Sequence, residues 1–219
     1  ASKPLVNFTG DGTLSITNGY NAIRVIGDLM IDIDLTVKQD RPLYADGIAA
    51  QNILVEKGHK LDLTVNGAGF ITDNNLFMTG SEVKINASTP HISTGTVTKN
   101  ILHCGNTISL ENTKLDITAV SDQSICSVTA GNVGIFADNE LYITKGSEIS
   151  YSVSTKGDEI FASYFTGMLA DYIFIEDSSV DIKMDAELCA YSYGIFSQGD
   201  IDIQYSDVKA DIKTSGTAT

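Results

Sequence analysis

The stretch "GIFADNELYITKGSEISYSV", residues 134–153, returns in related form as "GMLADYIFIEDSSVDIKM" from Gly167 and as "GIFSQGDIDIQYSDVKADI" from Gly194. Each copy has apolar residues at alternate positions, then a short polar bend, and then a second alternating stretch. Because the side chains of a strand point to opposite faces with a period of two, one face of each strand is apolar and must be buried. The repeat therefore predicts β-strands that stack on one another.

An apolar-x-apolar core marks eight such units along the chain. The paired residues are Leu14/Ile16, Leu29/Ile31, Ile53/Val55, Leu76/Met78, Ile108/Leu110, Leu141/Ile143, Ile173/Ile175 and Ile201/Ile203. A second alternating stretch follows each of the last six units, with the expected inward residues Leu61/Leu63/Val65, Val83/Ile85/Ala87, Leu115/Ile117/Ala119, Ile149/Tyr151/Val153, Val180/Ile182/Met184 and Val208/Ala210/Ile212. One coil of two or three short strands cannot bury its apolar face alone, whereas coils stacked about 4.8 Å apart pair their backbones and align like residues into a continuous core.

We therefore expect an all-β protein, a right-handed parallel β-helix of about seven to eight coils, formed by residues 1–219 as a single domain. The spacing of the units varies from 15 to 33 residues, which suits a helix whose corner loops differ in length while its strands stay in register. The first two units are only 15 residues apart, so residues 1–26 are a candidate N-terminal cap. Residues 213–219 are expected to form a polar spacer.

Other architectures fit this pattern less well. Leucine-rich repeats require an LxxLxLxxN motif and left-handed hexapeptide helices require a strict six-residue period, and the sequence has neither. A β-sandwich would have turn signals every ~8–12 residues, but it gives no reason for one sequence pattern to recur.

The charge of the chain narrows the classes of partner. There are 28 acidic and 14 basic residues, for a formal net charge of −14, and the only arginines are Arg24 and Arg41. Nucleic-acid binding needs clustered Lys and Arg to displace phosphate counterions, so no nucleic-acid partner is expected, and an anionic membrane surface is disfavoured for the same reason. No run approaches the ~20 apolar residues of a membrane span, so no membrane insertion is expected. A neutral sugar or a divalent cation suits the charge better.

Three cysteines, Cys104, Cys126 and Cys189, are too few for a disulfide framework. None belongs to a CxxC pair or has a histidine at metal-ligand spacing. We interpret them as small buried apolar residues rather than reactive thiols. The number of cysteines does not indicate whether the protein resides in an oxidising or a reducing compartment.

Stacking the units also aligns the outward residues of the first strand. The expected central column is Ser15, Met30, Leu54, Phe77, Ser109, Tyr142, Phe174 and Asp202. The flanking columns contain Tyr172 and the carboxylates Glu111, Glu140 and Glu176. An exposed aromatic ring edged by hydrogen-bonding groups suits a sugar, which has an apolar face and a polar rim. The candidate ligand-binding residues are therefore Phe77, Tyr142, Phe174, Tyr172, Glu111, Glu140 and Glu176.

Two alternatives to a sugar site stay open for this column. Tyr and Phe favour strands in any protein, and a corner segment, a partner subunit or a neighbouring domain of the same chain could cover the apolar column.

A candidate calcium site comes from Asp28, Asp32 and Glu56, because Asp32 and Glu56 are expected on adjacent rungs and hard cations bind carboxylate oxygens. The alternative is a solvated acidic surface. No EF-hand loop supports the site, since "DIKMDAE" at 181–187 lacks the required glycine and spacing.

The repeated pattern G-I-(F/A)-(A/S)-x-x-x-(L/I)-x-I, followed by a Gly/Ser bend, resembles the pectate-lyase-like right-handed β-helix group. Within that group it is most similar to bacterial cell-surface β-helix proteins described as carbohydrate-binding domains. The resemblance covers residues 13–212. It implies a secreted or cell-surface location, a polysaccharide ligand and, in some members, calcium.

The catalytic patterns of enzymes in this group do not match. Pectate lyases use an arginine beside a calcium-binding acid cluster, but Arg24 and Arg41 lie outside the well-repeated middle of the chain. The stretches "NTK" at 112–114 and "GHK" at 58–60 differ from the polygalacturonase motifs, and His59, His91 and His103 occupy different repeat positions. We therefore expect a secreted or cell-surface module that binds polysaccharide without catalysis. The alternatives are a structural or adhesive stalk domain and, third, a polysaccharide lyase or hydrolase.

Overall fold

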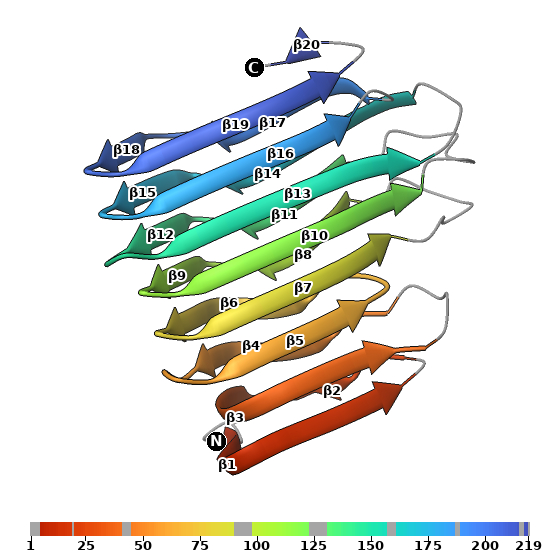
Figure 1. The fold of residues 1–219 in the computed structure, drawn as a ribbon, viewed down its shortest axis with the longest axis vertical. Coiled ribbons are helices and arrows are strands. Elements are labelled where there is room, and N and C mark those ends of the chain that lie inside the picture. The colour runs from red at the N-terminus through yellow and green to blue at the C-terminus, as the bar shows by residue number, and fades with distance from the viewer. Residues whose placement is uncertain are drawn as a thin grey trace.

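The computed structural model describes residues 5–18, 20–40, 45–89, 98–122, 131–156, 161–186, 189–214 and 217–218. Within these residues the chain forms strands and no helix, so it contains no helix that could cross a membrane. The strands pair in parallel with those of the coil before and the coil after, and the coils stack along one axis from the N-terminal to the C-terminal end (Figure 1). The predicted right-handed parallel β-helix is confirmed.

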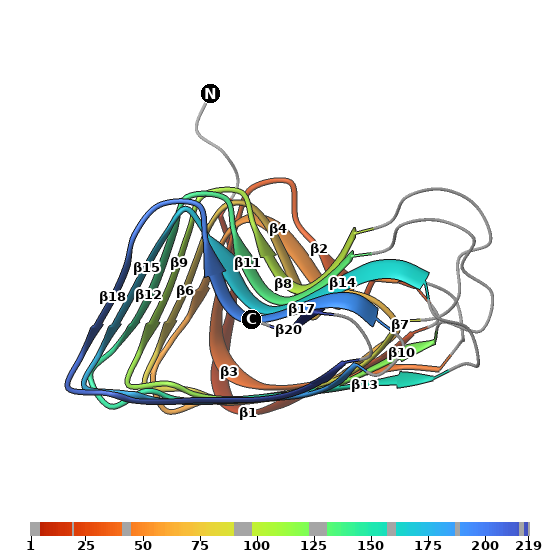
Figure 2. The ribbon, with the colours of Figure 1, turned by 90° about the horizontal axis from the view of Figure 1, so that it is seen from above.

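Each complete coil contributes strands to three faces (Figure 2). The long face consists of β1 (Leu5–Asn18), β3 (Asp28–Gln39), β5 (Lys60–Val65), β7 (Glu82–Thr89), β10 (Lys114–Asp122), β13 (Glu148–Lys156), β16 (Ser179–Ala186) and β19 (Asp207–Thr214). The short face consists of β9 (Thr107–Glu111), β12 (Glu140–Thr144), β15 (Tyr172–Glu176) and β18 (Ile201–Gln204), together with the first parts of β1 and β3 and the second parts of β4 (Ile48–Val55) and β6 (Phe70–Thr79). The bent face consists of β2 (Ile23–Arg24), the first parts of β4 and β6, β8 (Thr98–Cys104), β11 (Gly131–Ala137), β14 (Phe161–Ala170), β17 (Cys189–Ser197) and β20 (Thr217–Ala218).

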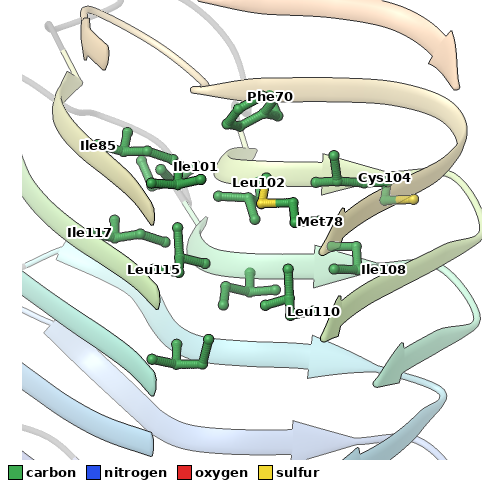
Figure 3. Packing of buried hydrophobic residues seen from close by; sticks show 14 of the residues in the cluster. Phe70, Met78, Ile85, Ile101, Leu102, Cys104, Ile108, Leu110, Leu115 and Ile117 are labelled. Atoms are coloured by element: carbon green, nitrogen blue, oxygen red, sulfur yellow. The ribbon is translucent and has the colours of Figure 1, made fainter. Parts of the chain in front are cut away.

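The inner side chains stack in the predicted register. On the short face Ile143 pairs with Ile175, and both are fully buried. On the long face Leu115 pairs with Ile149, and Ile149 pairs with Val180. Figure 3 shows how residues of all three faces fill the interior between them. Like residues therefore lie over one another from coil to coil.

The first unit is the exception, and its predicted alignment was wrong. Leu14 and Ile16 pair with Leu35 and Val37 of the long face, not with the short-face residues Leu29 and Ile31. The partners of Leu29 and Ile31 are Val6 and Phe8, also in β1. The error arises because the short-face and long-face strands have the same apolar alternation, so a period of two does not distinguish them. The unusual spacing of 15 residues therefore separates two different strand positions.

The bent face bends inward toward the long face, and glycine makes this approach possible (Figure 2). A Cβ atom on Gly134 would lie 2.8 Å from the ring of Tyr151 on β13. A Cβ on Gly167 would lie 2.5 Å from the carbonyl oxygen of Gly194 and 3.0 Å from Ile182. The glycine that begins each repeat therefore marks the place where backbone and core side chains leave no room for a methyl group.

Side-chain amides form a ladder along the corner that leads into the short face. Asn52 donates to Asp28 at 2.6 Å, and Asn75 donates to Asn52 at 3.1 Å. The ladder continues as Asn106 donates to Asn75 at 2.8 Å and Asn139 donates to Asn106 at 2.7 Å. Because the Asn52, Asn75 and Asn106 amides each donate and accept, the ladder satisfies polar groups at the corner and favours one register between coils.

The predicted role of the cysteines is confirmed for Cys104, which is free and fully buried. Its thiol donates to the carbonyl oxygens of Asn74 and Thr107, at 2.7 and 3.1 Å, and burial is the main cause that raises the pKa of the thiol. A thiol with a raised pKa is a poor nucleophile at neutral pH. Cys126 lies outside the described residues, as does the side chain of Cys189.

We predict that Ile175→Ala lowers the free energy of unfolding by about 2–5 kcal/mol, because it leaves a cavity in the inner stack. Ile203→Ala is the matched control, since Ile203 occupies the same column one coil further along but is 45% exposed. Urea unfolding of the two variants measures the difference. Equal losses would contradict the assignment of Ile175 to a closed core.

Gly167→Ala should destabilise the protein by about 1–3 kcal/mol, because the new methyl group forces the backbone or Ile182 to move. Gly12→Ala is the comparison, since nothing lies within 4 Å of a Cβ built on Gly12. That variant should be neutral or more stable by up to ~1 kcal/mol. Thermal unfolding of both proteins tests the prediction, and a harmless Gly167→Ala would show that the bent face is less close to the long face than described.

Candidate functional site

The outward column of the short face follows the predicted order over most of its length. Met30, Leu54, Phe77, Ser109, Tyr142, Phe174 and Asp202 pair in sequence from coil to coil. The expected first member, Ser15, is wrong, because it lies on the long face opposite Thr36, and Asn7 pairs with Met30 instead. The candidate ligand-binding residues therefore lie on one continuous sheet.

Three of the four predicted aromatic residues come together, and we call Tyr142, Tyr172 and Phe174 the Tyr142 cluster. The ring centroids of Tyr142 and Tyr172 are 6.1 Å apart, and those of Tyr142 and Phe174 are 6.2 Å apart. Both pairs are edge-to-face, with interplanar angles of 67° and 61°. All three side chains are partly exposed. The strand register creates the cluster, because Glu140 and Tyr142 of β12 pair with Tyr172 and Phe174 of β15.

Phe77 lies apart from the Tyr142 cluster. It is 39% exposed on β6, and Ser109 of β9 separates it from Tyr142 in the column. As in the predicted column, Ser109 interrupts the aromatic residues, so the structure has one aromatic cluster and one separate phenylalanine.

The predicted carboxylates flank the column on both sides. Glu140 accepts a hydrogen bond from the Thr107 hydroxyl at 3.3 Å and lies beside Tyr142. Glu111 is on the other flank, where its Oε1 atom is 2.7 Å from the Lys145 ammonium. Glu176 is on the same flank as Glu111 and is partly exposed. The rim of the cluster thus presents hydrogen-bond acceptors, one of them bound to a lysine.

Tyr142 keeps its proton more strongly than an ordinary tyrosine. Burial is the main cause that raises the pKa of its hydroxyl. The charge of Glu140, its hydrogen bond with the hydroxyl and the nearby Tyr172 raise the pKa further. At neutral pH the cluster therefore presents an uncharged tyrosine beside a carboxylate.

Two of the three candidate calcium ligands have protein partners of their own. Asp28 accepts from Asn52, and Asp32 is 2.8 Å from Nε2 of His59. His59 also lies 3.5 Å from Asp34 through its Nδ1 atom. In the part of the chain that the structure describes, no three His, Cys, Asp or Glu side chains form a group that could hold a metal ion. Asp28, Asp32 and Glu56 are therefore not gathered into such a group.

The two described histidines lie in different settings. His59 lies between two aspartates, whereas His103 contacts the Phe136 ring at 5.1 Å and Asn100 at 3.0 Å. Within the described residues, neither histidine is hydrogen-bonded to a serine, threonine or cysteine that could act as a nucleophile. His91 lies outside the described residues.

A second apolar row, which was not predicted from the sequence, lies on the bent face. We call it the bent-face row, and its members pair in the order Ala49, Ile71, His103, Phe136, Leu169 and Phe196. Phe196 is 40% exposed and contacts Tyr193 at 5.2 Å between ring centroids. The sequence does contain a signal for this row, because the third residue of "GIFA", "GMLA" and "GIFS" is a large apolar residue in each repeat.

Among the hollows formed by described residues, two border the bent face or the corner of the short face, outside the Tyr142 cluster. One, of about 340 Å³, is at the N-terminal end of the bent-face row, between Arg24, Ile71 and Asp73. The other, of about 440 Å³, lies at the corner between the short and long faces, where Gly58, Gly80 and Gly146 provide no side chains. Its charged rim is largely self-neutralised, since the Lys60 ammonium is 2.9 Å from Glu82 and that of Lys114 is 4.0 Å from Glu148.

Comparison with known proteins gives no assignment of this site. No protein-family model, no curated protein and no solved structure has a significant match to the chain. A function must therefore be inferred from the chemistry of the surface.

We predict that Tyr142 titrates above the ordinary tyrosine value of about 10, and that Glu140→Gln lowers its pKa without fully restoring that value, because burial remains. Ultraviolet pH titration of the wild type minus that of Tyr142→Phe isolates the one tyrosine. Glu148→Gln, on the long face, is the control and should leave the titration unchanged. An unshifted Tyr142, or no response to Glu140→Gln, would contradict the environment described.

Proposed function

We propose that the protein is a secreted or cell-surface recognition module that binds polysaccharide, without catalysis, at the Tyr142 cluster. The observation behind this proposal is the edge-to-face arrangement of Tyr142, Tyr172 and Phe174, partly exposed on a regular sheet. Aromatic rings offer an apolar surface to the C–H face of a sugar, and tyrosine adds a polar group at its edge.

The surroundings of the cluster support a sugar over a purely apolar ligand. Glu140 and Glu176 lie on opposite flanks of the aromatic column, within reach of its rim. Carboxylates accept hydrogen bonds from hydroxyl groups, and binding sites of this class combine an apolar surface with a few such polar groups. The pairing of β12 with β15 sets the backbone positions of the cluster before binding, which lowers the entropic cost of association.

The repeat resemblance supports the same proposal. The β-helix fold and the recurring "GIF" and "GML" stretches agree with the pectate-lyase-like group, and we propose membership of its carbohydrate-binding cell-surface branch. Calcium belongs to this proposal as a companion of the glycan, although Asp28, Asp32 and Glu56 by themselves do not form a metal-binding group in the described residues. Binding should therefore be measured with and without calcium.

A structural or adhesive stalk role is the second candidate, and the bent-face row favours it. Phe136, Leu169 and Phe196 form a row on a face other than that of the Tyr142 cluster. Apolar rows on a surface can mark contacts with another protein or domain. Concentration-dependent association that Phe196→Lys abolishes, while glycan binding persists, would assign the row to assembly.

We predict that Tyr142→Ala and Phe174→Ala each weaken binding to the glycan selected on an array by about tenfold or more. An aromatic contact contributes ~0.5–1.5 kcal/mol beyond the burial of its surface, and tenfold corresponds to about 1.4 kcal/mol. Phe196→Ala is the matched control, because it removes an exposed phenylalanine from the bent face. Isothermal titration calorimetry gives the affinities, and circular dichroism checks the fold of each variant.

Two results would overturn the proposal. One is the absence of binding to neutral, acidic and amino-containing glycans, with and without calcium. The other is binding that survives both substitutions in the Tyr142 cluster but is lost in Phe196→Ala, which would move the site to the bent face.

A further inference from the structure

We propose that the glycan bound at the Tyr142 cluster bears free amino groups, as in a de-N-acetylated amino-sugar polymer, and binds as a polycation. This inference rests on the proposed function and names its ligand class. It follows from the distribution of charge around the three faces of the helix.

The short face and its two corners are acidic around the Tyr142 cluster. In the coils between residues 105 and 204 the described acidic residues on this side are Glu111, Asp138, Glu140, Asp171, Glu176, Asp177, Asp200 and Asp202. Two lysines are described on this side, Lys145 with its ammonium 2.7 Å from Glu111 and, at the corner with the long face, Lys114 with its ammonium 4.0 Å from Glu148. The charge of the remaining carboxylates is thus largely uncompensated by lysine.

The long face of the same coils has a different balance. Its lysines alternate with acidic residues, and several of them form ion pairs with these residues. The Lys183 ammonium is 2.8 Å from Asp181, and the Lys209 ammonium is 2.8 Å from Asp207. Lysines are therefore available in these coils, but they lie on the face that lacks the aromatic cluster. The negative charge that faces a ligand is concentrated where the aromatic rings are.

The negative charge of the short face favours some classes of glycan over others. A uronate or sulfated chain would bring like charges to Glu140 and Glu176, and juxtaposed like charges oppose binding. A neutral chain would gain nothing from the carboxylates beyond hydrogen bonds. An ammonium group would gain charge-assisted hydrogen bonds, which are about twice as strong as neutral ones.

The aromatic rings favour the same kind of ligand. A cation over the face of a tyrosine or phenylalanine, within about 6 Å of the centroid, is attracted by the electrons of the ring. Tyr142 lies beside Glu140, so a ring face and a carboxylate can contact one ammonium together. Carboxylates recur on successive coils of the short face, with Glu140 on one flank, Glu176 on the other and Asp202 in the central column. A polymer with regularly spaced amines would therefore engage several coils at once, which raises its affinity.

The test compares two ligands that differ in little but charge. Chitosan hexasaccharide has free amines, and chitin hexasaccharide has the same sugars with the amines acetylated. At low salt and pH 6 we expect wild-type protein to bind chitosan at least about tenfold more tightly than chitin, with the difference shrinking as salt screens the charges. Polygalacturonate should bind more weakly than either.

Matched carboxylate variants locate the effect. Glu140→Gln should weaken binding of chitosan severalfold more than binding of chitin, because it removes the charge but keeps the shape and one oxygen that can accept a hydrogen bond from a hydroxyl group. Glu148→Gln removes one carboxylate from the long face and should change neither affinity. Both substitutions are at exposed or partly exposed positions, so the fold should persist, and circular dichroism verifies it.

The outcomes separate this inference from the proposed function. Equal binding of chitosan and chitin, both lost in Tyr142→Ala, would overturn the amine preference and leave polysaccharide binding standing. No binding of any glycan would overturn both. Pentalysine that binds as tightly as chitosan, with both affinities unchanged in Tyr142→Ala, would identify a general attraction for cations, such as basic peptides, and would also overturn the inference.

Discussion

Every feature of this protein depends on the in-register parallel pairing of each strand with its counterpart in the next coil. The pairing satisfies the backbone of a chain with no helix in its described part, and it places like side chains over one another at the spacing of β-strands. Ile143 over Ile175 and Leu115 over Ile149 build the interior in this way. The same constraint aligns Glu140 with Tyr172 and Tyr142 with Phe174 on the outside. The core and the candidate site thus share one cause.

Much of this arrangement could be predicted from the sequence, because a period of two assigns each residue to the inside or the outside. The same period did not identify which strand of a coil Leu14 and Ile16 belong to, and the first unit was misplaced for that reason. The bent face was missed because its alternation breaks at glycine: Gly134 and Ile135 are adjacent and both buried. The edge-to-face contacts of Tyr142 depend on side-chain directions, which the alignment of the repeat sequences does not determine.

The three faces of the helix have different surfaces even though they share one core. On the long face, lysines and carboxylates neutralise one another, as Lys60 and Glu82 do, and exposed pairs of this kind add little stability. The effect of these ion pairs is to keep the long face polar without giving it a large electrostatic field of one sign. The short face lacks this balance and has aromatic residues where the long face has Thr, Ser and Lys. The short face therefore combines an aromatic cluster with carboxylates that are largely uncompensated by lysine, whereas the row that contains Phe136 and Phe196 lies on the bent face.

The rigidity of the scaffold determines how the short face could bind a polymeric ligand. Asn75 and Asn106 link neighbouring coils through their side-chain amides, and Gly167 lets two faces approach closely. The side chains of the Tyr142 cluster therefore stand on strands whose relative positions are set before any ligand arrives, and little ordering entropy remains to oppose binding. A ligand that is itself extended and regular would match this surface over several coils, whereas a compact ligand would contact only one. The geometry of the helix thus favours polymers over small molecules, whichever chemical group provides the specificity.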